Sequence, residues 1–210
     1  MLKAPGGAFV DEMVEAFRNR VAEAQKDIAR KAMLDSLVKN EHGHYTFDIT
    51  GLDLSGADEV ARLQGGNYKV SDYAKSCFTS TKKDGYDAKH RLVAEQKYRV
   101  VLVFGNEIKR DAERTTKGFQ DFAAKFGYAK PLAGIVPRIR EVISDDLMKE
   151  FDIWYVAALH DPIADSDGYP SVLLAYRGGG GRWVSAYWVG PGRRWDDSGA
   201  FAFLVPASQP

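Results

Sequence analysis

The chain of 210 residues is long enough to form one substantial hydrophobic core or two small domains. Apolar residues make up 45% and charged residues 28%, a composition typical of globular proteins, which excludes a disordered chain, a collagen-like repeat and a disulfide scaffold. The 29 basic and 29 acidic residues cancel, so no overall field attracts nucleic acid or anionic lipid, and such a partner needs a local patch.

Cysteine content and hydropathy suggest the compartment. Cys77 is the only cysteine, which rules out an intramolecular disulfide and favours a reducing environment. Its helical neighbours Tyr73, Ala74 and Phe78 predict a thiol buried in the core rather than a nucleophile. The longest apolar run, 154–159, is far shorter than the roughly 20 residues of a membrane span. We therefore expect a cytoplasmic protein that makes no membrane contact.

A long N-terminal helix is predicted within residues 1–40, because 8–39 contain neither glycine nor proline. Apolar residues recur there at spacings of four and three, the pattern of a helical seam: Val10, Val14, Phe17, Val21, Ala24 and Ile28. Thirty helical residues span about 45 Å. Two interpretations stay open: the helix lies across the protein's own sheet, or it contacts a partner or a second copy, forming a homodimer.

Residues 41–150 predict a mixed helical region with one or two strands. Alternating apolar residues at 45–49 and a β-branched run at 98–104 indicate the strands. Helix N-caps are expected at four hydroxyl residues that each precede an amphipathic or acidic stretch: Ser55, Ser71, Thr115 or Thr116, and Ser144.

The composition changes after Phe151. The last 60 residues hold all four tryptophans and no lysine, and turn residues divide them into short apolar stretches. These stretches predict a β-meander over 151–210, with strands at 154–159, 172–176, 182–188 and 200–205. The expected fold is therefore a single α+β domain over 1–210, with an antiparallel sheet formed mainly by the C-terminal 60 residues.

One candidate for catalysis is the acidic loop that follows the 154–159 strand. Imidazole and carboxylate groups bind divalent metals or orient a water molecule, and this loop contains His160, Asp161, Asp165 and Asp167. Glu107 follows the 98–104 strand and would join them if that strand lies beside 154–159. Such a cluster would make a metal-assisted hydrolase or nuclease. A solvated turn, with its aspartates bonded to local backbone, explains the same residues, and no metal or cofactor is predicted.

His42 and His44 form a weaker candidate for a metal edge. Side chains two residues apart on a strand point the same way. Two ligands alone bind metal weakly, and a polar loop between helix and strand explains both histidines equally well.

The favoured candidate site is a set of arginines interleaved with aromatic residues in the C-terminal sheet. Arginine and tryptophan are enriched at the energetic centres of protein interfaces. The predicted binding residues are Arg177, Arg182, Trp183, Trp188, Arg193, Arg194 and Trp195. The sequence therefore favours a non-enzymatic binding or regulatory protein with a protein partner. Basic residues are in local excess between 75 and 99, and such residues contact phosphates. Nucleic acid therefore stays open as a second, less favoured partner.

Overall fold

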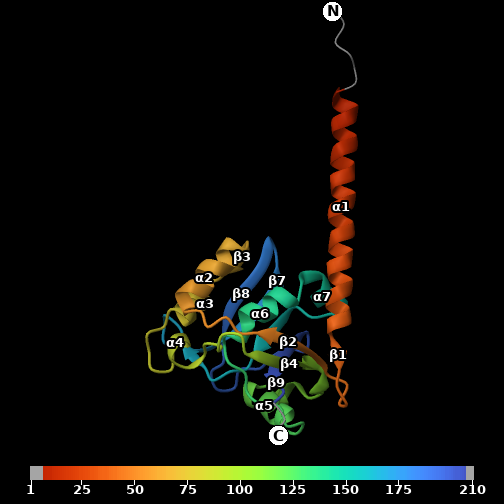
Figure 1. Ribbon diagram of the computed structural model, residues 1–210. Helices are drawn as coiled ribbons and strands as arrows, with labels where there is room; N and C mark the ends of the chain where they lie inside the picture. Colours follow the sequence, from red (N-terminus) through yellow and green to blue (C-terminus); the bar gives the residue numbers. More distant parts are fainter. Residues whose placement is uncertain (1–6, 207–210) are drawn as a thin grey trace, which may run out of the picture. The chain divides into compact units, whose positions relative to one another are not determined.

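The computed structural model describes residues 7–206, together with all side chains outside α1 and part of those within it. The chain separates into two compact units, one ending at Leu37 and the other beginning at Val38. Helix α1 (Gly7–Ser36) belongs to the first unit (Figure 1). Of the predicted seam, the side chain of Val10 lies outside the described set. Val14, Phe17, Val21 and Ile28 are each exposed, by 42%, 68%, 39% and 70%.

The second unit contains a mixed sheet with the order β1-β2-β4-β9-β5-β7-β8-β3, and β6 pairs with β7 beside this path. In chain order the strands are β1 (Val38–Lys39), β2 (Tyr45–Thr50), β3 (Tyr68–Val70), β4 (Lys97–Phe104), β5 (Tyr155–Ala158), β6 (Ile163–Ala164), β7 (Pro170–Gly178), β8 (Gly181–Trp188) and β9 (Gly199–Leu204).

The helices of this unit are α2 (Gly56–Gly65), α3 (Asp72–Phe78), α4 (Tyr86–Lys89), α5 (Thr116–Ala124), α6 (Ile135–Val142) and α7 (Asp145–Glu150), with short 3-10 turns at Gly105–Glu107 and Asp111–Glu113. Their starts follow local capping chemistry. The side chains of Ser55, Ser71, Thr115 and Ser144 each accept a backbone N–H of the first turn, as predicted.

The core lies on both faces of the sheet. In β4 the four residues Val100 to Val103 are fully buried, because side chains that alternate between the two faces meet helices on each side. One face packs against α5, where Phe119 stacks on Phe201 of β9 with ring centroids 3.8 Å apart. Helix α6 contacts β2, β5, β7 and β8, and Figure 1 shows it crossing the sheet with α2 and α3 beside β3 and β8.

The sheet differs from the predicted C-terminal meander in its order and direction. Strand β9 does not follow β8 but lies between β4 and β5, and its pairing with β5 is parallel. Strand β3 also pairs in parallel, with β8. Strands from the predicted segments 41–150 and 151–210 thus share one sheet. The physical reason is burial: Ala200, Phe201, Ala202 and Phe203 are apolar on both faces, which favours a central position over an edge.

No helix in the described range 7–206 combines the length and the apolar composition needed to cross a membrane.

Candidate binding surface

The β7–β8 hairpin carries the site. A two-residue connection joins its strands, with Gly178 paired to Gly181, and Gly180 has a φ of +83°. The four glycines 178–181 therefore form the hairpin tip, where a positive φ is tolerated because glycine lacks a Cβ. Beyond the tip the two strands bring aromatic side chains into register, and Tyr176 stacks on Trp183 with centroids 5.7 Å apart.

A first hollow, which we call the acidic hollow, lies at the end of β8 that is remote from the hairpin tip. It has a volume of about 420 Å³ and is lined by Tyr73, Asp165, Asp167, Tyr169, Ser171, Ala186, Tyr187 and Trp188. The residues Tyr73, Tyr169 and Trp188 are exposed by 53%, 55% and 44%. The lining contains two carboxyl groups and no basic side chain.

A second hollow, the tyrosine hollow, shares Ala186 and Tyr187 with the first. It has a volume of about 310 Å³ and is lined by Trp154, Tyr155, Leu174, Tyr176, Arg177, Ser185, Ala186, Tyr187, Trp195 and Asp196. Trp195 packs at its base, 4.7 Å from the ring of Tyr187 and 5.7 Å from that of Tyr155. Burial and the nearby Asp196 raise the pKa of Tyr155 above its usual value.

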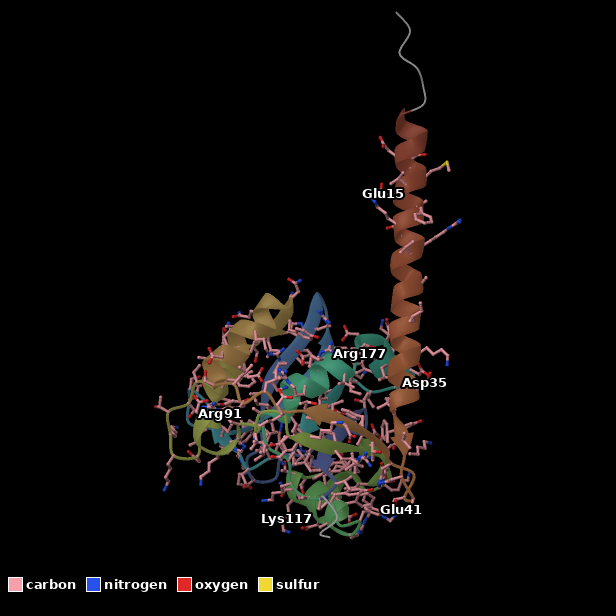
Figure 2. All side chains as sticks on the ribbon, viewed as in Figure 1. Glu15, Asp35, Glu41, Arg91, Lys117 and Arg177 are labelled. Carbon is pink, nitrogen blue, oxygen red and sulfur yellow. The ribbon has the colours of Figure 1, made fainter. Side chains whose placement is uncertain are left out.

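Three of the predicted binding arginines stack on aromatic rings of this same chain. The guanidinium carbon lies 3.9 Å from the Trp154 centroid for Arg177, 4.0 Å from Tyr68 for Arg182, and 4.8 Å from Tyr187 for Arg193. Arg177, labelled in Figure 2, also donates from Nε to the Ile153 carbonyl oxygen over 2.8 Å. These contacts hold the arginines in place and use part of their donor capacity.

The other predicted binding residues divide between surface and core. Trp188 is exposed, with its indole against Gly190, where a Cβ would come within 2.2 Å of the ring. Arg194 pairs with Asp111. Trp195 is only 3% exposed, and its Nε1 donates to Thr116 Oγ1 over 3.1 Å, so it supports the surface from below. The Nε1 atom of Trp183 is buried and has no acceptor among the described residues.

His160, the centre of the alternative metal site, is fully buried. Its Nδ1 faces the Asp161 carbonyl oxygen at 2.7 Å, and its Nε2 lies 2.9 Å from the Leu173 backbone nitrogen. Burial lowers the pKa of His160 to about 3, and the neighbouring His90 contributes. Both ring nitrogens are therefore engaged by backbone in a neutral imidazole, which leaves neither for a metal or for proton transfer.

The aspartates of this loop do not converge on His160. Asp161 forms an ion pair with Lys130 over 2.8 Å, which lowers its pKa. Asp165 is 7% exposed and closes its own turn: Oδ1 accepts the backbone N–H groups of Asp167 and Tyr169, each over 3.0 Å, and Oδ2 accepts the Ser171 hydroxyl. This arrangement matches the turn predicted as the alternative to a metal loop.

Glu107 lies in a different network. Its Oε2 is 2.8 Å from His44 Nε2, and His44 Nδ1 is 2.7 Å from the Tyr128 hydroxyl, which accepts from Asn40. The second oxygen of Glu107 accepts the Phe104 backbone N–H. Within residues 7–206 no three or more His, Cys, Asp and Glu side chains are grouped as they would be around a metal ion.

Two residues of the acidic hollow escaped sequence reasoning. Tyr73 was predicted to share a buried helical face with Cys77, yet it is 53% exposed. Cys77 itself is buried as predicted, and burial raises the pKa of its thiol to about 12. Tyr169 follows the Asp167–Gly168 turn and was not among the predicted binding residues. Its place directly after a turn was the one available signal, since loops lie at the surface and often carry binding residues.

No family model matches the chain, and no match exists among the curated proteins or the solved structures.

Proposed function

We propose that this is a non-enzymatic protein that binds a protein partner through the surface around β7 and β8. One observation carries the proposal: two neighbouring hollows meet at Ala186 and Tyr187, and half-exposed aromatic rings line both of them. Soluble proteins rarely leave several large aromatic rings together at the surface unless the patch binds something.

Preorganisation supports a binding role. The rings of this surface pack on one another, as Tyr169 and Trp188 do with centroids 6.1 Å apart. Arg193 and Arg177 stack on rings that line the hollows. Because these side chains are already ordered, a partner that covers them loses less side-chain entropy than it would on a flexible surface. Tyrosine and tryptophan also offer a large contact area with only two rotatable angles each.

Charge favours a protein over a nucleic acid. The chain has no net charge, and the acidic hollow places Asp165 and Asp167 beside its aromatic rings. Carboxyl groups repel phosphates, whereas nucleic-acid binding depends on many basic contacts with them. The single, buried Cys77 agrees with a role in the reducing cytoplasm.

The first unit favours a second contact, with another copy of the chain. Helix α1 exposes Phe17 by 68% and Ile28 by 70%, on the seam predicted from the sequence. Two such seams bury apolar area when they pair, which single helices in water cannot do. We propose homodimerisation through α1 as a separate property of the protein.

Partner capture tests the main proposal. The full chain and a Trp188→Ala/Tyr169→Ala variant are used as bait in extracts of the source cells, and bound proteins are quantified by mass spectrometry. The matched control is Leu52→Ala/Val93→Ala, which removes exposed apolar side chains outside both hollows.

We expect specific partners to bind the wild type and the control and to be lost, by about tenfold or more, from the hollow variant, as for an interface centre. An unchanged partner list with a folded hollow variant would contradict the proposal.

A further inference from the structure

Strand β8 has a free outer edge beyond its contact with β3. Strand β3 pairs only with Arg182, Trp183 and Val184, after which Ser71 turns away into α3. The last backbone hydrogen bond on that side is from the Ser71 N–H to the Val184 carbonyl oxygen, over 3.0 Å, and the Ser185 hydroxyl also donates to the Ser71 hydroxyl over 2.9 Å. The backbone of 185–188 is therefore paired on one side alone, with β7.

The hydrogen-bond alternation of the hairpin identifies the free groups. The two-residue turn makes Gly178–Gly181 a hydrogen-bonded pair, and the Val189 N–H bonds to the Pro170 carbonyl at the other end, over 2.8 Å. Odd-numbered residues of β8 thus bond to β7, and even-numbered ones face outward. Ala186 and Trp188 are the outward residues beyond β3, and their backbone N–H and C=O groups have no hydrogen bond to any described residue.

Residues of this edge line both hollows. Trp188 lines the acidic hollow, Ser185 lines the tyrosine hollow, and Ala186 and Tyr187 line both. A strand added to the edge would point its successive side chains to opposite faces of the sheet. Alternate side chains of such a strand would therefore enter the acidic and the tyrosine hollow in turn.

The lining of the acidic hollow selects the chemistry of its occupant. Three exposed rings, Tyr73, Tyr169 and Trp188, surround a space that also contains Asp165 and Asp167. Asp165 is committed to its own turn, whereas Asp167 is exposed at the rim. Aromatic faces together with carboxylates attract organic cations, both by charge and through the ring quadrupoles. A lysine or arginine side chain complements this hollow, and an acidic one is repelled.

We infer that the edge of β8 at 185–188 binds an extended peptide segment of the partner by strand addition, with a basic side chain of that segment in the acidic hollow. Backbone groups of Ala186 and Trp188 supply the hydrogen bonds, and the two hollows select alternate side chains. This inference rests on the proposed function, because it specifies how the same surface holds its protein partner.

Displayed peptides provide the probe. A library of random eight-residue peptides is selected on the full chain, and the best binder is synthesised for fluorescence anisotropy. We expect one position to be enriched in Lys or Arg. Replacing that residue by its uncharged analogue, norleucine or citrulline, should weaken binding about tenfold or more, as for a cation lost from an aromatic site.

N-methylation of single peptide amides tests strand pairing directly. Methyl groups on amides that face β8 should abolish binding, whereas those on the alternate amides should be tolerated, giving a period of two. On the protein, Ala186→Pro removes one edge donor without touching the β7 ladder and should weaken binding about tenfold. Asp167→Asn should reduce the preference for the basic residue, with Asp121→Asn, on α5, as its matched control. Circular dichroism establishes that each variant is folded.

Several outcomes would overturn the inference. These are a library without an enriched basic position, a methylation pattern without period two, and Ala186→Pro binding the peptide as the wild type does. If partner capture still depends on Trp188 and Tyr169 in those cases, the proposed function stands and only strand addition fails. If Ala186→Pro converts a dimeric protein to a monomer, the edge of β8 binds a second copy of the chain instead of a peptide, and the inference fails.

Discussion

The backbone N–H of Leu173 in β7 donates to Nε2 of His160, 2.9 Å away, at the point where the chain leaves β5. On the other side of the ring, Nδ1 donates to the Asp161 carbonyl oxygen over 2.7 Å. One nitrogen must accept and the other must donate, so these two backbone partners require a neutral imidazole with its proton on Nδ1. His160 therefore joins two segments of the sheet rather than serving chemistry.

This pairing predicts an acid-sensitive fold. In the unfolded chain His160 has an ordinary pKa near 6.5, whereas in the folded protein burial lowers it to about 3. As the pH falls below 6.5, the unfolded chain takes up a proton that the folded protein does not, so the free energy of unfolding decreases. The expected slope is about 1.4 kcal/mol per pH unit between about pH 5.5 and 3.5.

Urea unfolding of the wild type and of His160→Gln at several pH values measures this slope. His160→Asn replaces His160→Gln if the latter does not fold. The comparison between wild type and variant isolates the contribution of His160, because burial also raises the pKa of Glu59, and that shift changes stability in the opposite direction as the pH falls. Removing the exposed His42 is the control. Equal pH dependence in wild type and His160→Gln would contradict the assignment.

Glu59 anchors α2 to α6 through a buried ion pair. Its Oε2 accepts from Arg138 Nη2 over 2.9 Å, and the exposed fractions of the two side chains are 4% and 7%. Glu59→Gln leaves the guanidinium buried with less compensation, and Glu141, at 3.3 Å from Arg138, replaces only part of it. We expect a loss of about 3 kcal/mol in the free energy of unfolding.

The control for this ion pair is Glu113→Gln. Glu113 pairs with Arg110 at the surface, so Glu113→Gln should lower the free energy of unfolding by less than about 1 kcal/mol. Denaturant titration of both variants provides the comparison. Similar losses of stability in the two variants would show that burial does not determine how much the Glu59–Arg138 pair contributes to the free energy of unfolding.

The 165–171 turn separates a structural aspartate from an exposed one. Asp165 accepts three hydrogen bonds within the turn, whereas Asp167 is exposed at its tip. Asp165→Ala leaves these donors without an acceptor and should lower the free energy of unfolding by about 2 kcal/mol. Asp167→Ala should change it by less than about 0.5 kcal/mol. Thermal unfolding measures both, and equal effects would contradict the turn-closing role of Asp165.

Helix α1 yields a prediction about assembly. We expect the full chain to be dimeric and a chain beginning at Lys39 to be monomeric in light scattering, because the exposed apolar seam is absent from the shorter chain. Replacing Phe17 and Ile28 by serine should have the same effect as truncation. Replacing the exposed Arg18 and Arg20 by serine is the matched control. A monomeric full chain would refute the dimer.

Local chemistry determined what could be predicted from the sequence. The caps at Ser55 and Ser144, the β-branched strand 98–104 and the glycine hairpin depend on interactions between residues a few positions apart. The α+β class and the positions of β2, β4, β5, β7, β8 and β9 follow from the same short-range patterns. The short strands β1, β3 and β6 were not predicted, because two or three residues carry too little periodicity, so 41–150 holds three strands rather than the one or two expected. The burial of Cys77 followed as well, since a thiol on an apolar helical face is covered whenever that helix packs.

Tertiary structure alone decided which distant residues meet. Glu107 joined His44 rather than His160, and β9 entered between β4 and β5, because strand order depends on long-range pairing that periodicity does not encode. The edge at Ala186 and Trp188 is free only because β3 ends opposite Val184. Side-chain type is a property of the sequence, but a hydrogen-bonding edge is created by what the rest of the chain leaves unpaired.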